Sequence, residues 1–307
     1  MLINNSYNVV SQKKKDYKAI IKRNIIAWLI MLPSLLLFLF FVWLPIGKNV
    51  VVSFFADYKM TKFVFLDNYK TIFAEEVFLA ALRNTFMYIL WSILIGYFVP
   101  LIMGFLLSEC FHAKGFFRIC LYIPCMISGI AVVFLFKNIY LDESYSILNV
   151  ILKSFGGTPH AWAGNPDIVI PLIVLAMTWK GAGGTALIYL SNFQQIDTSL
   201  YEASRIDGLS PVKRFFKITL PQMKSTLLTL LILQIISVFQ VFYEPLVIGE
   251  YGGPNNASMS LMLLSYKYAF VDLKFPKAAA TSVILSIIII AFTIGYFALT
   301  KRLNKED

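Results

Sequence analysis

The chain has 307 residues, of which 58% are hydrophobic and 14% charged, and its formal net charge is +10. Soluble domains usually contain about 45–50% apolar and about 25% charged residues, so this composition excludes a water-soluble fold. The cations are divided among the gaps between apolar segments, which argues against nucleic-acid binding and is typical of membrane topology and contact with anionic headgroups.

Six apolar segments are long enough to cross a bilayer, which requires about 20 residues. The predicted spans are Ile25–Ile46, Thr85–Leu107, Phe116–Phe136, Ile168–Leu190, Thr226–Ile248 and Ala278–Leu299. The first is longer than the about 7–15 residues of a signal-peptide core, so we expect a retained helix. The predicted fold is an all-α integral membrane protein: a six-helix transmembrane domain (25–299) between a basic N-terminal tail (1–24) and a C-terminal tail (300–307).

The distribution of Lys and Arg predicts the orientation of the chain. They are more numerous in the two tails and in the second and fourth loops than in the first, third and fifth loops, mainly because of the tail segment from Lys13 to Arg23. By the positive-inside rule, both termini are expected to be cytoplasmic.

Histidine and cysteine, the side chains that most often bind metals or act in catalysis, are scarce in this sequence. The two histidines, His112 and His160, lie in predicted loops, and the three cysteines form no C-x-x-C pair. We expect the cysteines to be small buried apolar side chains. The sequence predicts neither a metal site nor catalytic residues.

The fourth loop (191–225) predicts two short helices. Asp197 or Ser199 can cap the start of the first helix. Gly208 tolerates the left-handed conformation that ends a helix, and Pro211 suits the first turn of the next one. The expected unit is a small helix-turn-helix on the cytoplasmic side.

The first short helix has features of a docking element. Leu200, Ala203 and Ile206 recur at helical spacing and would form an apolar edge. Small side chains at Ala203, Ser204 and Gly208 would let another backbone approach closely. The residues alone leave open an alternative, an amphipathic helix on the headgroups supported by the basic residues that follow.

This loop resembles the EAA loop of the permeases of binding-protein-dependent ATP-binding-cassette importers. The matching residues are Glu202, Ala203, Ser204, Asp207, Gly208, Phe215, Ile218, Thr219, Leu220 and Pro221. Ser204 and Leu209 depart from the pattern, since the family most often has Ala at both positions. Phe65–Tyr69, Trp179–Gly181 and Gly252–Pro254 are similar to segments of the carbohydrate permeases of the maltose and glycerol-phosphate type.

The resemblance implies a mechanism and partners. A cytoplasmic coupling helix between spans 4 and 5 would sit in a cleft of a separate ATPase, with Glu202, Ala203, Ser204, Ile206, Asp207 and Gly208 as the coupling residues. The implied complex contains a second permease subunit as a heterodimer, two copies of the ATPase and an extracytoplasmic solute-binding protein, in the bacterial inner membrane. The chain has no G-x-x-x-x-G-K-[ST] motif, so we expect no cofactor here and the use of ATP and Mg²⁺ by the partner ATPase.

Polar residues in the fifth span predict a substrate path. Gln234, Ser237, Gln240 and Glu244 fall within an arc of roughly 120° on a continuous helix. Such a stripe usually faces protein or a water-filled cavity. Aromatic side chains for stacking a sugar would come from Tyr243 and Trp179. The alternative is that the stripe forms hydrogen bonds with neighbouring helices.

Lys180 lies near the middle of the fourth span and is followed by a glycine-rich stretch. A cation at this depth is costly, so we expect it at a helix break or facing a cavity. An ion pair with Glu244 is disfavoured, because the two residues differ by roughly 13 Å in height at 1.5 Å per residue.

Other functions fit the sequence less well. A membrane-embedded protease would require nucleophile and base, or metal ligands, within the spans, and neither H-E-x-x-H nor G-x-S-x-G occurs. An ATP-independent channel or carrier would not require a docking loop. A permease for a non-sugar solute remains open, because such permeases share the coupling loop.

Overall fold

The computed structural model describes residues 17–110 and 112–303. The predicted N-terminal tail lies largely outside these residues, as does the end of the C-terminal tail. The chain divides into two units between Val51 and Val52. The described part of the first unit is one helical stretch, formed by α1 (Tyr17–Phe38), a π-helical turn (Leu39–Trp43) and all but the last residue of α2 (Leu44–Val52).

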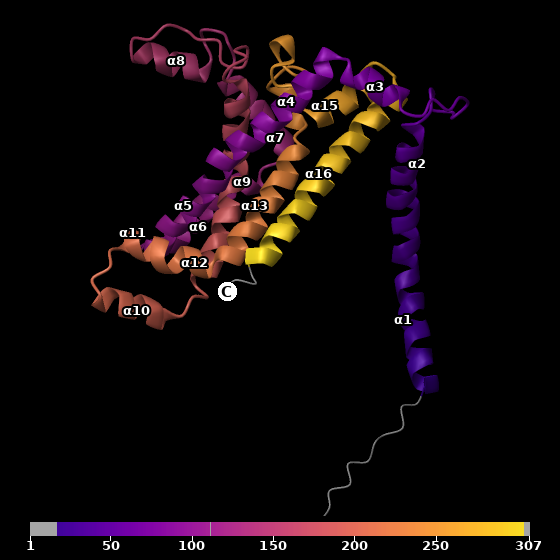
Figure 1. Ribbon diagram of the computed structural model, residues 1–307. Helices are drawn as coiled ribbons and strands as arrows, with labels where there is room; N and C mark the ends of the chain where they lie inside the picture. Colours follow the sequence, from indigo (N-terminus) through magenta and orange to yellow (C-terminus); the bar gives the residue numbers. More distant parts are fainter. Residues whose placement is uncertain (1–16, 111, 304–307) are drawn as a thin grey trace, which may run out of the picture. The chain divides into compact units, whose positions relative to one another are not determined.

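The second unit is built from helices, and no strand forms within the described residues (Figure 1). Its first half contains α3 (Asp67–Phe73), α4 (Glu76–Trp91), a π-helical turn (Ser92–Tyr97), α5 (Phe98–Glu109), α6 (Lys114–Met126), α7 (Gly129–Ile139), α8 (Ile147–Ser154) and α9 (Val169–Phe193). Its second half contains α10 (Thr198–Ile206), α11 (Pro211–Arg214), a π-helical turn (Phe215–Thr219), α12 (Leu220–Gln222), α13 (Lys224–Phe239), α14 (Tyr243–Val247), a 3₁₀ turn (Pro254–Asn256), α15 (Leu261–Tyr266), a π-helical turn (Lys267–Val271) and α16 (Phe275–Leu303).

Five helical stretches of the described chain are long and apolar enough to cross a membrane. They are Asn24–Val52, Glu76–Glu109, Val169–Phe193, Lys224–Val247 and Phe275–Lys301. The third expected span is instead two helices, α6 and α7, bent by 93°. The count reaches six if this bent pair is one span, so the expected number of six is not confirmed.

The second span begins earlier than the sequence predicts, at Glu76 rather than near Thr85. Charged residues such as Arg83 end the apolar window, but they do not end the helix. Phe78 and Ala81 lie on the added turns and are fully buried against the rest of the protein. Packing against the rest of the protein therefore extends the helix beyond the apolar window from which the span was predicted.

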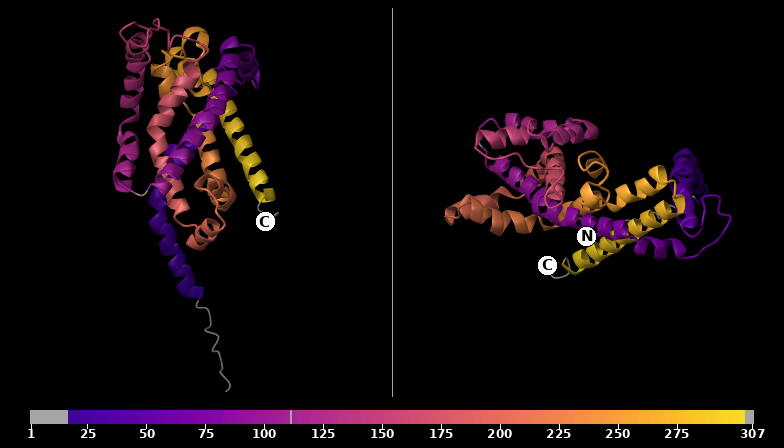
Figure 2. Two further views of the ribbon diagram at one scale, coloured as in Figure 1. Left: turned by 90° about the vertical axis from the view of Figure 1, so that its left-hand side faces the viewer. Right: turned by 90° about the horizontal axis from the view of Figure 1, so that it is seen from above.

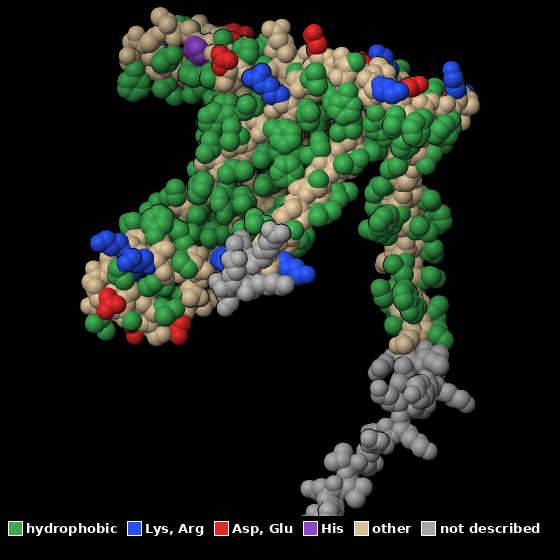
Figure 3. Space-filling view, in the orientation of Figure 1, with side chains coloured by type: hydrophobic (Ala, Val, Ile, Leu, Met, Phe, Trp, Pro, Cys, Tyr) green, Lys and Arg blue, Asp and Glu red, His purple; other side chains and the backbone are tan. Residues whose placement is uncertain are grey.

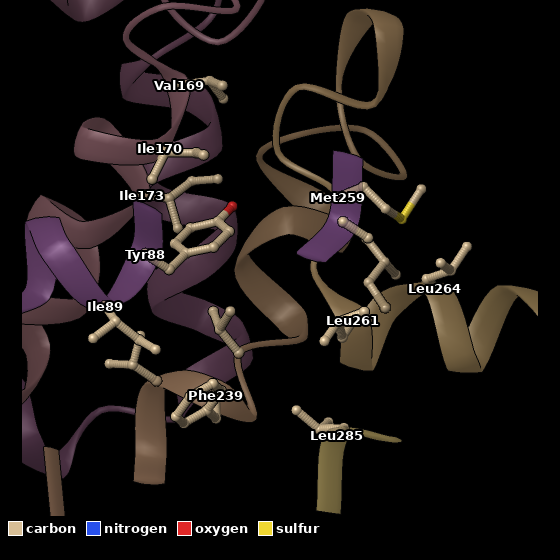
Figure 4. Packing of buried hydrophobic residues seen from close by; sticks show 14 of the residues in the cluster. Tyr88, Ile89, Val169, Ile170, Ile173, Phe239, Met259, Leu261, Leu264 and Leu285 are labelled. Carbon is tan, nitrogen blue, oxygen red and sulfur yellow. The ribbon is translucent and has the colours of Figure 1, made fainter. Parts of the chain in front are cut away.

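The core lies where α4, α9, α13 and the segment around α15 meet (Figure 4). Tyr88 is fully buried there, and its hydroxyl donates to the Ser258 carbonyl oxygen at 2.9 Å. Asn84, one turn earlier, donates to the Met259 carbonyl oxygen at 3.1 Å. These side chains supply hydrogen-bond partners to the buried, irregular backbone at Ser258 and Met259.

The outward faces are apolar, with Met126 74% and Ile294 64% exposed. Figure 3 shows hydrophobic side chains along the spans of the second unit and charged ones gathered at its two ends. Lipid is the solvent that makes this surface stable. The side view in Figure 2 shows α9, α13 and α16 running between the same two ends.

Candidate functional site

Two places in the second unit bring the predicted functional residues together: the segment from α10 to α12 and a cavity beside the start of α14. They lie at different levels of the helical bundle, and α10 lies beyond the ends of the long helices (Figure 1).

Helix α10 has a cap at each end. The Asp197 carboxylate accepts a hydrogen bond from the Ser199 amide at 2.9 Å, which lowers the pKa of Asp197. Gly208 has φ +71°, and the Leu209 amide donates to the Ser204 carbonyl oxygen at 3.0 Å. This is the glycine-ended C-terminus that the sequence predicts. Of the two expected N-caps, Asp197 is the one used.

The predicted coupling residues divide between two faces of α10. Ser204 is buried at 3% exposure and turns toward the chain's own loop. The other five, Glu202, Ala203, Ile206, Asp207 and Gly208, are exposed. Ile206 is 87% exposed, although it is a large apolar side chain outside the hydrophobic segments. The apolar edge of α10 is therefore not covered by the described part of this chain.

The segment is attached to the bundle through its inner side. Tyr201 and Thr219 share a hydroxyl hydrogen bond at 2.9 Å. The Phe215 ring lies 4.5 Å from that of Phe105 on α5, centre to centre. The buried Arg214 guanidinium lies 3.5 Å from a carboxylate oxygen of Glu109, at the end of α5. A force on α10 would reach α5 through these contacts.

The fifth span is not a continuous helix, contrary to the assumption behind the predicted stripe. Helix α13 ends at Phe239, and α14 begins at Tyr243 after a short break. The Ser260 hydroxyl donates to the Val241 carbonyl oxygen at 2.7 Å and accepts from the Leu263 amide. One serine thus satisfies a backbone group freed by the break and caps the start of α15.

A cavity of about 580 Å³ lies beside this break. Its lining combines a carboxylate, an amide, hydroxyls and aromatic rings: Ser237, Gln240, Tyr243 and Glu244 from the predicted path, with Phe242, Ser265, Tyr266 and Phe270 among the others. The rings of Phe242 and Tyr266 lie 4.9 Å apart, and those of Tyr266 and Phe270 5.0 Å apart. Flat apolar faces beside hydrogen-bonding groups can bind a sugar, whose ring has apolar and hydroxylated sides.

Two residues of the predicted path lie elsewhere. The Gln234 side-chain amide donates to the Ser92 hydroxyl at 2.6 Å, which joins α13 to the π-helical turn after α4. Trp179 packs edge-on against Phe136 at 5.5 Å between ring centres. Gln234 therefore takes the alternative role weighed for the stripe, a hydrogen bond between helices.

A break in α9 at Lys180, one of the two expectations for this residue, does not occur, because α9 is continuous through it. The break lies in the neighbouring segment instead, between α6 and α7. The Lys180 side chain lies over Gly129, the first residue of α7. No ion pair joins Lys180 to Glu244 in the part of the chain that the structure describes.

Sequence reasoning missed the contribution of α15 to the cavity. The residues between the fifth and sixth spans were expected to form a loop. They instead contain α15, which packs into the core through the buried Leu261, Leu263 and Leu264 and contributes Ser265 and Tyr266 to the cavity. A signal was present: Ser260 precedes an apolar run, as at a capped helix start. The run was too short to qualify as a span.

The sequence matches a family model described as "Binding-protein-dependent transport system inner membrane component" over residues 93–305. The chain is 33% identical to the probable ABC transporter permease protein YurN of Bacillus subtilis, with 93% of this chain and 99% of YurN covered. It is 31% identical to the arabinooligosaccharides transport system permease protein AraP of Bacillus subtilis, with 91% and 90% covered.

The fold is similar to that of a chain in the crystal structure of a bacterial alginate ABC transporter in complex with an alginate pentasaccharide-bound periplasmic protein. The TM-score is 0.81 at 23% identity, with 95% of this chain and 99% of that chain covered. At this identity the likeness shows the fold alone.

Proposed function

Because the chain belongs to the family of binding-protein-dependent transport system inner membrane components, we propose that it is the permease subunit of an ATP-binding-cassette importer for a carbohydrate. The carbohydrate assignment is supported by AraP, which is named for arabinooligosaccharides. The aromatic and polar lining of the cavity beside α14 supports it independently.

Helix α10 is proposed as the coupling helix, seated on a separate ATPase. The observation that carries this role is the exposure of Ile206 at 87%, at the tip of a segment attached only through its inner side. An exposed apolar side chain on a rigid, capped helix is suited to a hydrophobic pocket of a partner. Under this proposal ATP and Mg²⁺ are used by the ATPase, and this chain carries out no chemistry of its own.

The cavity is proposed as part of the translocation path, with Ser237, Gln240, Tyr243 and Glu244 facing the solute. Trp179 and Lys180, which do not line this cavity, are proposed to contact the solute elsewhere along the path. Transport requires that the solute bind differently to the inward-facing and outward-facing states. The Lys180 side chain lies over the first residue of α7, beside the α6–α7 break, and Glu244 lies on α14, just after the α13–α14 break. Interrupted helices are common at the solute sites of transporters.

The proposed assembly has a second permease subunit, as a heterodimer, two ATPase copies and an extracytoplasmic solute-binding protein. The proposed location is the bacterial cytoplasmic membrane, with α10 and both termini on the cytoplasmic side. The concentration of Lys and Arg in the N-terminal tail and in the α10 loop supports this orientation.

The docking role is tested by purifying the tagged chain from its native membrane in mild detergent and identifying the accompanying proteins. We expect an ATPase with the native chain and its loss with Ile206→Asp. Tyr145→Asp is the matched control, because Tyr145 is also exposed, at 70%, and lies at the opposite end of the unit. Retention of the ATPase by Ile206→Asp would overturn the docking role.

The substrate class is tested by uptake in cells that have or lack the chain. Labelled neutral oligosaccharides, uronic-acid oligosaccharides, amino acids and peptides form the panel. Loss of uptake confined to a carbohydrate supports the proposal. Loss confined to an amino acid or a peptide overturns the carbohydrate assignment and leaves the importer role intact.

A further inference from the structure

Helix α8, in the loop between α7 and α9, has an apolar face that the described part of the chain leaves uncovered. Ile147, Val150 and Ile151 are 50%, 53% and 49% exposed, and Phe155, directly after the helix, is 87% exposed. At 100° per residue these four positions fall within an arc of roughly 140°. The surface is therefore one continuous face.

The opposite side of α8 is held by a polar network. Asn149 is fully buried, and its side-chain oxygen accepts from the His160 amide and the Trp162 indole, both at 2.9 Å. Its side-chain nitrogen donates to the carbonyl oxygens of Glu143 and His160 at 3.0 Å. The network fixes the rotation of α8 about its own axis, so the apolar face has one defined direction.

That direction is toward the spans. Figure 1 shows α8 lying across the direction of α9, at the end of the unit opposite α10. In Figure 3 hydrophobic side chains gather on the underside of this loop, and the histidine and acidic side chains lie above them. A helix that lies flat at the end of a transmembrane bundle, with its apolar side turned toward the bundle's level, matches the geometry of the bilayer interface.

We propose that α8 is an interfacial helix whose face of Ile147, Val150, Ile151 and Phe155 is immersed at the boundary between headgroups and acyl chains. Lys153, exposed at the flank of this face, places its ammonium among headgroup phosphates while its stem stays in the apolar layer. The backbone carbonyl oxygens of Asp142 and Glu143 accept from Asn149 on the network side of α8. Immersion would fix residues 138–167 against the membrane and leave the polar side free.

Spin labels on the full-length chain, reconstituted with its co-purified partners in phosphatidylethanolamine–phosphatidylglycerol vesicles, test this inference. The labels are attached at Ile151→Cys and Phe155→Cys, with Thr158→Cys in the same loop as the control. Cys110, Cys120 and Cys125 are first replaced by serine. Serine at position 125 can still donate to the Lys180 carbonyl oxygen and accept from the Gly184 amide. Phe155 is so exposed that its label disturbs no packing.

The readout is collision of each label with oxygen, which dissolves in lipid, and with a nickel chelate, which stays in water. We expect the ratio of oxygen to nickel collisions to be several-fold higher at positions 151 and 155 than at 158. Equal ratios at all three positions would overturn the inference, because the face would then be in water. Shielding of 151 and 155 from both agents would also overturn it, because a protein partner would then cover the face.

Discussion

The Arg214 guanidinium lies 3.5 Å from the Glu109 carboxylate, between residues more than a hundred positions apart in the chain. The Arg214 side chain is 8% exposed and that of Glu109 37%. Arg214 is the last residue of α11, the short helix that follows α10, and Glu109 is the last residue of α5. The pair therefore connects the proposed docking segment to the helix that continues the second span.

Arg214→Met is expected to weaken this connection while keeping the length and apolar contacts of the side chain. Removing one partner of a fully buried pair costs about 3–5 kcal/mol, and the exposure of Glu109 makes the cost here smaller. The expected results are a lower melting temperature of the purified complex and reduced transport per ATP hydrolysed. The exchange Glu109→Arg with Arg214→Glu should recover part of both losses. No recovery would show that the pair acts only through packing.

Gly208→Ala is expected to disturb the α10 turn through the backbone alone. Gly208 has φ +71°, a conformation that costs an L-residue roughly 1–2 kcal/mol, and an added Cβ meets nothing within 4 Å. Gly156 is a matched control, because it has φ +82° and equally open space, in the loop after α8. Both variants carry similar backbone strain. If only Gly208→Ala loses ATPase binding, Gly208 has a role in docking. Equal effects would contradict that role.

The sequence predicted the parts of this protein that follow from local chemistry. The apolar segments of the five long helical stretches, the Asp197 cap and the glycine that ends α10 each depend on residues adjacent in the chain. The breaks between α6 and α7 and between α13 and α14 could not be predicted in this way. They depend on partners supplied from a distance, such as the Ser260 hydroxyl on the Val241 carbonyl oxygen. The glycine-rich stretch after Lys180 suggested a break in the wrong helix; within it, Gly183 lies against the Leu121 backbone of α6 and serves close packing.

Gly183→Ala is expected to separate α9 from α6. A Cβ at Gly183 would collide with the Leu121 carbonyl oxygen, so backbone must shift. Overpacking of this kind usually costs about 1–3 kcal/mol. Gly181→Ala, in the same helix, meets nothing within 4 Å and should be neutral or slightly stabilising. Thermal unfolding of the two purified variants compares them directly, and equal melting temperatures would exclude a packing role for Gly183.

Glu75 lies at the end of the bundle opposite α10 and should make the stability of the protein depend on pH. It accepts hydrogen bonds from Lys277 and Tyr268, linking the start of α4 to α16 and to the segment after α15. Partial burial raises the pKa of Glu75, but these bonds outweigh it and hold the pKa below its ordinary value of 4.5. A depressed folded-state pKa means that the stabilisation is complete above about pH 4.5 and is lost as pH falls through the folded value.

Glu75→Gln should therefore lower the melting temperature at pH 7 and reduce its change with pH below 4.5. Melting temperatures of the two proteins measured between pH 3.5 and 7 test this prediction. Parallel curves for the native chain and the variant would show that other groups cause the acid sensitivity.

Glu244 and Gln234 were predicted to share one stripe, and the structure assigns them different surroundings that kinetics can distinguish. Glu244 lines the cavity, whereas Gln234 donates to Ser92 between two helices. Glu244→Gln replaces the carboxyl group with an amide of similar volume. It should raise the apparent KM for uptake severalfold and leave the melting temperature nearly unchanged.

Gln234→Leu removes the interhelical hydrogen bond. Such a bond is worth about 0.6 kcal/mol on average in a membrane, so the variant should have a slightly lower melting temperature and an unchanged KM. A KM effect at position 234 and none at position 244 would place the solute path on the other side of α13, toward Ser92.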